Sequence, residues 1–265
     1  MPNSPKIVGI LNITPDSFSD GGKFLSPENA ISQCEKLIND GADIIDIGAE
    51  STRPNAKIIS PEEEWQRLEP ALKEISKSNL TAEISIDSRN FETAKKALKY
   101  GVSYINDVSG LEDERFFPLL KEHNCKIIFM HNLGIPASKE RIMSPYCDVV
   151  SEIYKWAEEK IAHLESQNIN KDKIIFDPGI GFGKTAEQSL KIVKRFSEFK
   201  KLGVELYAGH SEKSFMTLFT DKPAGEREIE TQIISAYLAQ NGADYIRVHQ
   251  PQENIRAIHA ASKLW

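Results

Sequence analysis

Side chains that could bind a polar ligand recur where short apolar runs of this chain end. Three of them are hydrogen-bond acceptors, Asp87, Asn106 and Asp177, and three can carry positive charge, Lys213, Arg247 and His249. Carboxylate and amide oxygens accept hydrogen bonds and suit a ligand edge that is rich in N–H groups. The cationic side chains suit an anion, so the two groups together indicate a heterocycle that carries a phosphate ester.

The elements that position these side chains follow from an alternation of apolar and amphipathic stretches. Eight short apolar runs predict strands at residues 7–11, 44–47, 84–86, 104–105, 127–130, 174–176, 204–207 and 245–248. Amphipathic stretches between them predict helices, among them residues 27–39, 61–76, 91–99 and 148–167. Strands this apolar are buried on both faces, and their alternation with helices indicates a parallel sheet.

A repeated turn supports closure of that sheet into a barrel. Gly41, Gly101, Gly203 and Gly242 each stand between an expected helix and the strand that follows. Glycine takes the left-handed conformation that ends a helix. Eight units of roughly 33 residues fit βαβ units and favour a closed (β/α)₈ TIM barrel over an open doubly wound sheet. No linker or low-complexity segment divides residues 1–265, which are therefore expected to form a single domain.

Strand ends, and not strand starts, carry the polar groups in this pattern. Further examples are Asn12, Asp107, His131 and His210. The carboxyl ends of the strands of such a barrel meet at one mouth, where active sites lie. A single Asp or Asn there can equally cap the following helix. Caps do not require Arg, Lys and His, so the whole set predicts a binding site at the mouth.

Composition and local spacing exclude several other classes of protein. The net charge of −6 argues against nucleic acid or an anionic membrane as a partner. No stretch approaches the length of a membrane span, and the polar residues 1–6 do not resemble a signal peptide. Three cysteines without metal-ligand spacing fit free thiols and a cytoplasmic location. A zinc barrel would need His-x-His after the first strand, where this chain has Asn12.

The glycine-rich segment at residues 177–185, DPGIGFGKT, is not a nucleotide-binding loop. A phosphate loop needs glycine five residues before Gly183, and that residue is Pro178. We expect glycine here to let the backbone pass close to a flat ligand. Phe182 is then available to stack on that ligand.

Taken together, these motifs resemble those of dihydropteroate synthases. The similarity runs from about residue 7 to residue 256, and its most specific parts are residues 10–22, ILNITPDSFSDGG, and residues 177–185. Shorter matches are residues 46–54, DIGAESTRP, residues 105–108, INDV, residues 130–131, MH, and residues 247–249, RVH. The resemblance implies a transferase of folate synthesis, a sulfonamide target, that joins 6-hydroxymethyl-7,8-dihydropterin pyrophosphate to p-aminobenzoate and releases pyrophosphate and 7,8-dihydropteroate.

The resemblance also implies a role for particular residues. The pterin is expected to lie against Asp87, Asn106, Asp177, Lys213 and Phe182, the pyrophosphate against Asn12, Arg53, Arg247 and His249, and p-aminobenzoate against Thr52, Pro54, Phe182 and Ser214. Asp87, Lys213 and Asp20, the last in a closing loop with Phe18, are the expected catalytic residues. The implied cofactor is Mg²⁺ near Asn12. The family also implies a homodimer, for which an apolar stripe is available at Ile233, Ile234, Tyr237 and Leu238.

Two other functions stay open, and departures from the family pattern motivate the first of them. Glu212 replaces arginine in a Ser-Arg-Lys-Ser motif, and Ala49 replaces glycine; the other departures are Gln188-Ser189, Glu230 and Gln250. A charge reversal in an anion-binding mouth predicts disturbed loop ordering or weaker binding, so a non-catalytic pterin-binding paralogue is one alternative. A methyltetrahydrofolate:corrinoid methyltransferase is the other, although that family lacks the loop at residues 14–19.

Overall fold

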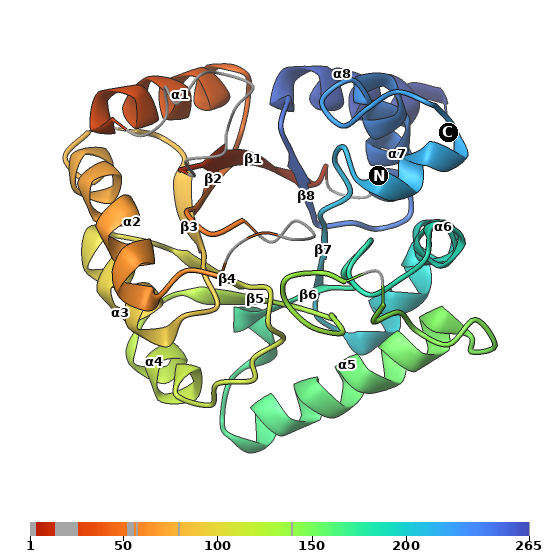
Figure 1. Cartoon of the computed structure of the whole chain (residues 1–265), viewed down its shortest axis with the longest axis horizontal. Coiled ribbons are helices and arrows are strands. Elements are labelled where there is room, and N and C mark those ends of the chain that lie inside the picture. The colour runs from red at the N-terminus through yellow and green to blue at the C-terminus, as the bar shows by residue number, and fades with distance from the viewer. Residues whose placement is uncertain are drawn as a thin grey trace.

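The computed structural model describes residues 4–13, 26–51, 56, 58–78, 80–138 and 140–264. Eight parallel strands form a closed barrel in chain order, and helices surround it (Figure 1). The strands are β1 (Lys6–Asn12), β2 (Ile44–Gly48), β3 (Glu83–Asp87), β4 (Tyr104–Asp107), β5 (Lys126–Met130), β6 (Ile174–Asp177), β7 (Glu205–Ala208) and β8 (Tyr245–Val248). The predicted TIM barrel is therefore confirmed, because each of these strands overlaps one of the apolar runs.

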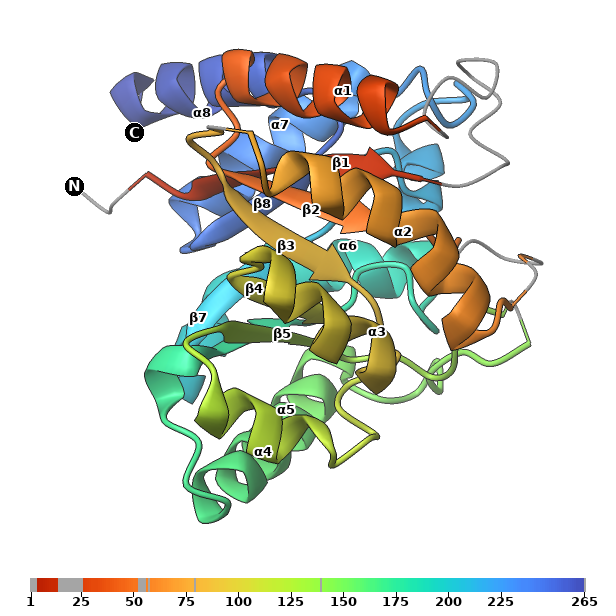
Figure 2. The same ribbon diagram turned by 90° about the vertical axis from the view of Figure 1, so that its left-hand side faces the viewer.

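Helices follow the strands in turn around the barrel. They are α1 (Pro27–Asn39), α2 (Pro61–Ile75), α3 (Phe91–Ala97), α4 (Phe116–Glu122), α5 (Val149–Ser166), α6 (Ala186–Lys194), α7 (Glu228–Gln240) and α8 (Pro251–Leu264). Short 3₁₀ turns are η3 (Leu98–Tyr100), η4 (Lys171–Lys173), η5 (Phe196–Leu202) and η6 (Ser214–Leu218). The arrowheads of β1, β2 and β3 point to one end of the barrel, away from the two chain termini (Figure 2). None of the helices described is both long and apolar enough to cross a membrane.

Local capping explains where several helices begin and end. Ser26 and Ser60 accept hydrogen bonds from the amides of Asn29 and Glu63 in the first turns of α1 and α2. The repeated glycines Gly41, Gly101, Gly203 and Gly242 all have positive φ, between 72° and 94°. They end the preceding helical segments as the repeat predicts.

Gln188, a departure from the family pattern, belongs to a helix cap. Its side chain accepts from the Thr185 amide, while the Thr185 hydroxyl accepts from the Gln188 amide, which is a capping box at the start of α6. Its Nε2 also donates to the carbonyls of Met143 and Ser144, at 3.2 and 3.0 Å. This departure therefore anchors the loop before α5 and does not reach the strand ends.

Two hydrophobic layers hold the barrel. The barrel interior is filled by a cluster of seven buried side chains: Val8, Ile44, Tyr104, Ile128, Ile175, Tyr207 and Tyr245. The larger cluster lies between the strands and the surrounding helices, and it includes the fully buried Phe116, Phe176, Phe196 and Phe199. A filled interior means that ligands bind at the ends of the strands and not within the barrel.

The start of the barrel strands carries more polar groups than the sequence suggested. Lys6 pairs with Glu83 at 2.7 Å, and Lys126 pairs with Glu205. The hydroxyl of Tyr104 donates to Glu83 at 3.0 Å, and that of Tyr245 donates to Glu205 at 3.1 Å. The expectation that strand starts show nothing comparable is wrong, and this network closes the barrel end opposite the site.

Candidate functional site

The centre of the strand-end cluster is a largely buried ion triad made by three strands. Arg247 of β8 donates from Nε to Asp46 Oδ2 at 2.7 Å and from Nη2 to Asp87 Oδ2 at 2.9 Å. Asn106 of β4 donates from Nδ2 to the same Asp46 oxygen at 3.0 Å. These bonds fix the planes of the guanidinium and the amide, and they leave Asn106 Oδ1 as an acceptor for a ligand.

The triad places two carboxylates close together with one cation between them. Burial and the charge of Asp46 raise the pKa of Asp87 to about 7, although Arg247 opposes the shift. Burial opposes the charge of Arg247, but Asp46 and Asp87 outweigh that effect and raise the Arg247 pKa. A carboxyl whose pKa lies near neutrality is a common property of functional sites.

Asp46 is a member of the site that sequence reasoning missed as a functional residue. It lies within the apolar run of β2 and is fully buried, and its Oδ1 has no hydrogen-bond partner in the described part of the chain. A signal was present, because an aspartate inside a strand buried on both faces must find a charged or donor partner. What the sequence did not reveal is that this partner is Arg247.

Asp177 and Lys213 form the second half of the cluster. A Cβ atom added at Gly209 of the β7 end would lie 3.6 Å from Asp177 Oδ2 and 3.9 Å from Lys213 Nζ, so both groups border the same space. Burial raises the pKa of Asp177, and Lys213 opposes that shift. Burial lowers the pKa of Lys213 to about 8, against the opposing charge of Asp177.

Lys213 also reaches the glycine-rich loop after β6. Its Nζ donates to the Ile180 carbonyl at 2.6 Å and lies 4.5 Å from the centre of the Phe182 ring. A cation over an aromatic face is attracted by the ring electrons. The structure therefore brings Lys213 and Phe182 together as expected from the sequence, with Ser214 next in the chain at the start of η6.

Buried contacts hold the glycine-rich loop in place. Gly179 has φ of +67°, and a Cβ atom there would lie 1.9 Å from the His131 carbonyl oxygen. Lys184 Nζ donates to the carbonyls of His131 and Phe182 at 3.0 and 2.9 Å and meets His131 Nδ1 at 2.9 Å. Burial lowers the pKa of His131 to about 3 and that of Lys184 well below its usual value. His131 and Lys184 therefore support the loop.

Two other strand-end residues serve local structure. Asp107 accepts from the amides of Ser109 and Leu111 at 2.8 and 2.7 Å and so stabilises its own turn. The Nε2 of His210 meets the Thr231 carbonyl and the Ser235 hydroxyl of α7 at 3.2 and 2.9 Å. The expectation that all strand-end polar groups face the mouth is therefore wrong for Asp107, His131 and His210.

Two further predicted anion-binding residues lie at the ends of β1 and β8, beside the triad. Asn12 ends β1, where it pairs with Gly48 of β2, and His249 follows β8 with its Nδ1 2.9 Å from the Ser211 hydroxyl. Thr52, Arg53, Pro54, Phe18 and Asp20 lie outside the described residues.

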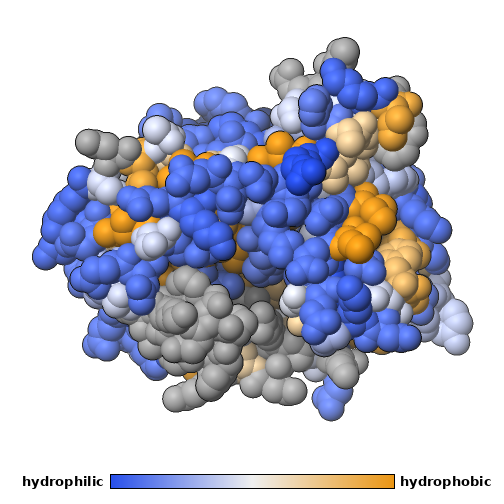
Figure 3. Space-filling model, turned by 90° about the horizontal axis from the view of Figure 1, so that it is seen from above, coloured by the Kyte–Doolittle hydropathy of each residue, from blue (hydrophilic) through white to orange (hydrophobic). Residues whose placement is uncertain are grey.

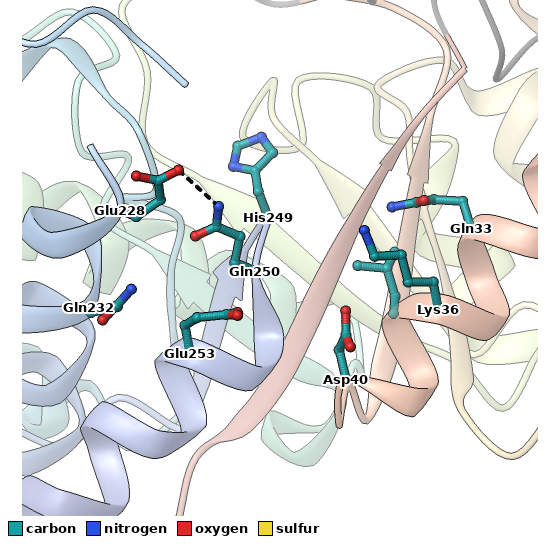
Figure 4. A pocket seen from close by; sticks show the side chains of 9 residues that line it. Gln33, Lys36, Asp40, Glu228, Gln232, His249, Gln250 and Glu253 are labelled. Carbon is teal, nitrogen blue, oxygen red and sulfur yellow. Dashed lines mark hydrogen bonds between the residues drawn. The ribbon is translucent and has the colours of Figure 1, made fainter. Parts of the chain in front are cut away.

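A cavity of about 500 Å³ lies beside His249, away from the triad. It is bounded by α1 on one side and by α7 and α8 on the other (Figure 4). Its lining residues are Gln33, Lys36, Leu37, Asp40, Glu228, Gln232, His249, Gln250 and Glu253. Gln250, another departure from the family pattern, donates to Glu228 in this cavity at 3.2 Å. Because Asp87, Asp177 and Lys213 do not line it, we place the functional site at the strand ends and not in this cavity.

Comparison with known proteins agrees with this geometry. Residues 8–249 match the family described as pterin binding enzyme. A dihydropteroate synthase of Synechocystis sp. is 37% identical, and the match covers 98% of this chain and 90% of the relative. The chain belongs to the dihydropteroate synthase family. Members of this family are transferases of folate synthesis.

Solved structures of the family share the whole fold. Dihydropteroate synthase from Anaplasma phagocytophilum, with bound 6-hydroxymethylpterin-monophosphate, is 39% identical, with a TM-score of 0.90 and coverage of 99% of this chain and 100% of that one. The enzyme from Xanthomonas albilineans, solved with 4-aminobenzoic acid, is 30% identical, with a TM-score of 0.89 and coverage of 99% and 93%.

Some relatives in the family are longer proteins. A probable bifunctional folylpolyglutamate synthase/dihydropteroate synthase of Haloferax volcanii is 36% identical over 96% of this chain, and the chain spans 30% of its length.

Proposed function

We propose that this chain condenses 6-hydroxymethyl-7,8-dihydropterin pyrophosphate with p-aminobenzoate to give 7,8-dihydropteroate and pyrophosphate, and that residues 1–265 act as a single domain. The observation that carries the proposal is the cluster at the strand ends, where buried acceptors and partly buried cations border one mouth. A pterin pyrophosphate needs both kinds of group, because its ring edge donates hydrogen bonds and its phosphates carry negative charge.

The pterin ring is the substrate part that the buried acceptors fit. Asp177 would accept from the amino group and a ring N–H, Asn106 would present Oδ1 to the neighbouring edge, and Asp87 would face the far ring nitrogens. Lys213 would donate on the carbonyl side, since it lies beside Asp177. The bond between Asn106 and Asp46 supports this orientation of the amide, because it directs the NH₂ group toward Asp46 and leaves Oδ1 for the ligand.

The p-aminobenzoate ring would pack on the other side of Lys213. Phe182 supplies an aromatic face, and Ser214 supplies a hydroxyl at the start of η6. Thr52 and Pro54 are proposed to complete this pocket from the loop after β2. An aromatic face beside a cation suits a flat anionic ring, because the ring can stack while its carboxylate stays hydrated or hydrogen-bonded.

The pyrophosphate would lie over Arg247, His249 and Asn12, with Arg53 as a further cation. Mg²⁺ is the proposed cofactor, and the Asn12 side-chain carbonyl suits it, because Mg²⁺ prefers oxygen ligands and usually keeps waters and substrate phosphates around it. The described residues contain no cluster of three or more metal-binding side chains, which fits an ion that arrives with the phosphates. Bound there, Mg²⁺ would neutralise charge that develops on the leaving group.

The proposed condensation requires stabilisation of charge more than it requires proton transfer. As pyrophosphate leaves, negative charge grows on the phosphates, where Arg247 and His249 would stabilise it. Positive charge grows on the pterin methylene, where Asp87 and Asp177 would stabilise it. An arylamine is neutral and nucleophilic at pH 7, so no strong general base is required. Asp20 is proposed to act from the loop after β1.

Release of pyrophosphate that depends on p-aminobenzoate is the test of this function. Pterin binding without release of pyrophosphate would contradict the enzyme proposal and favour the non-catalytic paralogue. Methyl transfer from methyltetrahydrofolate would favour the corrinoid methyltransferase. Arg247→Ala separates the readings further, because only a synthase should lose more affinity for the pyrophosphate form than for the pterin alone.

A homodimer is proposed through α7. The predicted apolar stripe divides in the structure, because Ile234 and Leu238 are buried while Ile233 is 64% exposed. Ile229, one turn earlier, is 61% exposed, so the outer side of α7 carries two uncovered isoleucines. The face in Figure 3 is mostly polar, with scattered apolar patches. Light scattering should give a dimer mass that Ile233→Asp reduces to that of a monomer; a dimer that survives the substitution contradicts this interface.

A cytoplasmic location is proposed from the thiols. All three cysteines, Cys34, Cys125 and Cys147, are free, as expected in a reducing compartment.

A further inference from the structure

The loop after β7 contains a strained residue with an unusual set of partners. Glu212 has φ of +61°, a conformation that side chains other than glycine rarely adopt. Its Oε2 accepts from the amides of Gly225 and Arg227 at 2.8 and 3.0 Å. Its own amide donates to the Thr231 hydroxyl at 3.2 Å. One carboxylate therefore fastens the β7 loop to the start of α7.

Arg227 makes the return connection from the start of α7 to the same loop. Its side chain is buried although residues 221–226 before it are exposed. Its Nη1 donates to the carbonyls of Glu212 and Lys213 at 3.3 and 3.0 Å, and its Nε donates to the Lys222 carbonyl at 2.9 Å. A buried guanidinium that donates its hydrogen bonds to backbone carbonyls holds those peptides in place.

The peptide held in this way carries a residue of the site. Lys213 follows Glu212, and its ammonium reaches the Ile180 carbonyl and the Phe182 ring. The Lys213 carbonyl is bound by Arg227 on one side while its side chain enters the mouth on the other. Movement of this peptide would displace the ammonium from Phe182 and shift Ser214 as well.

We propose that Glu212 and Arg227 form a clasp that positions Lys213 and Ser214 for the aromatic amine. The inference rests on the proposed function, and it makes Glu212 a positioning residue that acts through Lys213. The expectation of a disruptive negative charge in the mouth is wrong, because the Glu212 carboxylate is bound by amides that precede α7. A negative charge is also favoured there by the positive end of the helix dipole.

Charge complementarity makes the clasp depend on a carboxylate at position 212. An arginine at position 212 has no acceptor for the amides of Gly225 and Arg227, and it would place a second cation beside Arg227. Glu212→Arg would restore the usual family residue, yet the clasp predicts that it impairs this chain. If residue 212 had no influence on activity, Glu212→Arg would leave the kinetics unchanged.

Steady-state kinetics of four variants tests the clasp. Glu212→Gly removes the carboxylate but suits the positive φ, and Glu212→Gln keeps an acceptor oxygen in the same place. Glu226→Gln is the matched control, since it neutralises an exposed carboxylate of the same loop. Glu212→Gly and Glu212→Arg should raise KM for p-aminobenzoate by about tenfold, the size expected for loss of a charge-assisted hydrogen bond. For Glu212→Gln and Glu226→Gln, KM for p-aminobenzoate should stay within about twofold to threefold of the native value.

The two substrates separate positioning from general destabilisation. The pterin would be held by Asp87, Asn106 and Asp177 from other strands in addition to Lys213, so KM for the pterin pyrophosphate should change less than KM for p-aminobenzoate. The clasp would be overturned if both KM values rose equally. It would also be overturned if Glu212→Gly or Glu212→Arg kept the native KM for p-aminobenzoate.

Hydrogen–deuterium exchange keeps the test independent of catalysis. The amides of Gly225 and Arg227 should exchange slowly in the native chain and in Glu226→Gln, and faster in Glu212→Gly. Unchanged exchange in Glu212→Gly overturns the clasp even if the native chain is inactive. An inactive native chain in which the exchange still responds would instead refute the proposed function and leave the clasp standing.

Discussion

Replacing Arg247 by methionine should destabilise the protein in a way that depends on pH. The substitution keeps much of the side-chain volume but removes the cation between Asp46 and Asp87, which accept its hydrogen bonds at 2.7 and 2.9 Å. The Asp46 side chain is fully buried and that of Asp87 is 17% exposed, so water does little to replace the guanidinium. Removing one partner of such a buried ion pair costs about 3–5 kcal/mol.

The pH dependence follows from the Asp87 carboxyl. Its pKa is raised to about 7 even with Arg247 present, and Arg247 is the cause that lowers it. Loss of Arg247 therefore raises this pKa further. The folded variant then holds a proton over a pH range in which the native chain has released it, so the stability of the variant falls more steeply as pH rises above 7. For each unit by which the Asp87 pKa rises further, the variant should lose about 1.4 kcal/mol more of its free energy of unfolding at pH 8.5 than at pH 6.

Thermal and urea unfolding at pH 6 and pH 8.5 measure both effects. A loss of about 3–5 kcal/mol corresponds to a fall in Tm of roughly 6–20 °C for a domain of this size. Arg195→Met is a matched control, because Arg195 also bridges two carboxylates, Asp148 and Glu198, but in a pair that is about one-third to one-half exposed. The control should lose less than about 1 kcal/mol, equally at both pH values. A loss for Arg247→Met that is no larger than the control, or that does not grow with pH, would refute the reasoning.

Four further outcomes are expected, three of them at the carboxyl ends of the strands. Asp177→Asn should weaken pterin binding by about a hundredfold in calorimetry, because a buried carboxylate that accepts from N–H groups contributes about 1.5–3 kcal/mol or more. The Lys213 pKa is lowered to about 8, so the ammonium is present below that pH; kcat/KM for p-aminobenzoate should fall above pH 8, and Lys213→Arg should move this limb upward. Gly179→Ala should cost about 3–5 kcal/mol in urea unfolding, because φ is +67° and a Cβ atom would lie 1.9 Å from the His131 carbonyl oxygen. Gly203→Ala, with φ of +72° and no atom within 4 Å of its Cβ atom, should cost only about 1–2 kcal/mol.

The sequence by itself determined the barrel and half of the site. Hydropathy and periodicity are local properties, so they located all eight strands, and the turn glycines located the helix ends. Parallel strands place their carboxyl ends together in any closed barrel. For that reason the positions of Asp177, Lys213 and Arg247 at the ends of apolar runs are enough to predict that they share one mouth.

Only the tertiary structure decided which polar groups meet and where they point. Asp46 and Arg247 are 201 residues apart in sequence, and they meet because closure brings β1, β2 and β8 together. Glu212 looked like a charge in the mouth, but its left-handed backbone and the amides before α7 carry its carboxylate elsewhere. The physical reason is the same in each case: residue type and spacing set how far a side chain lies along its strand, whereas its direction and partners depend on contacts between segments that are distant in the chain.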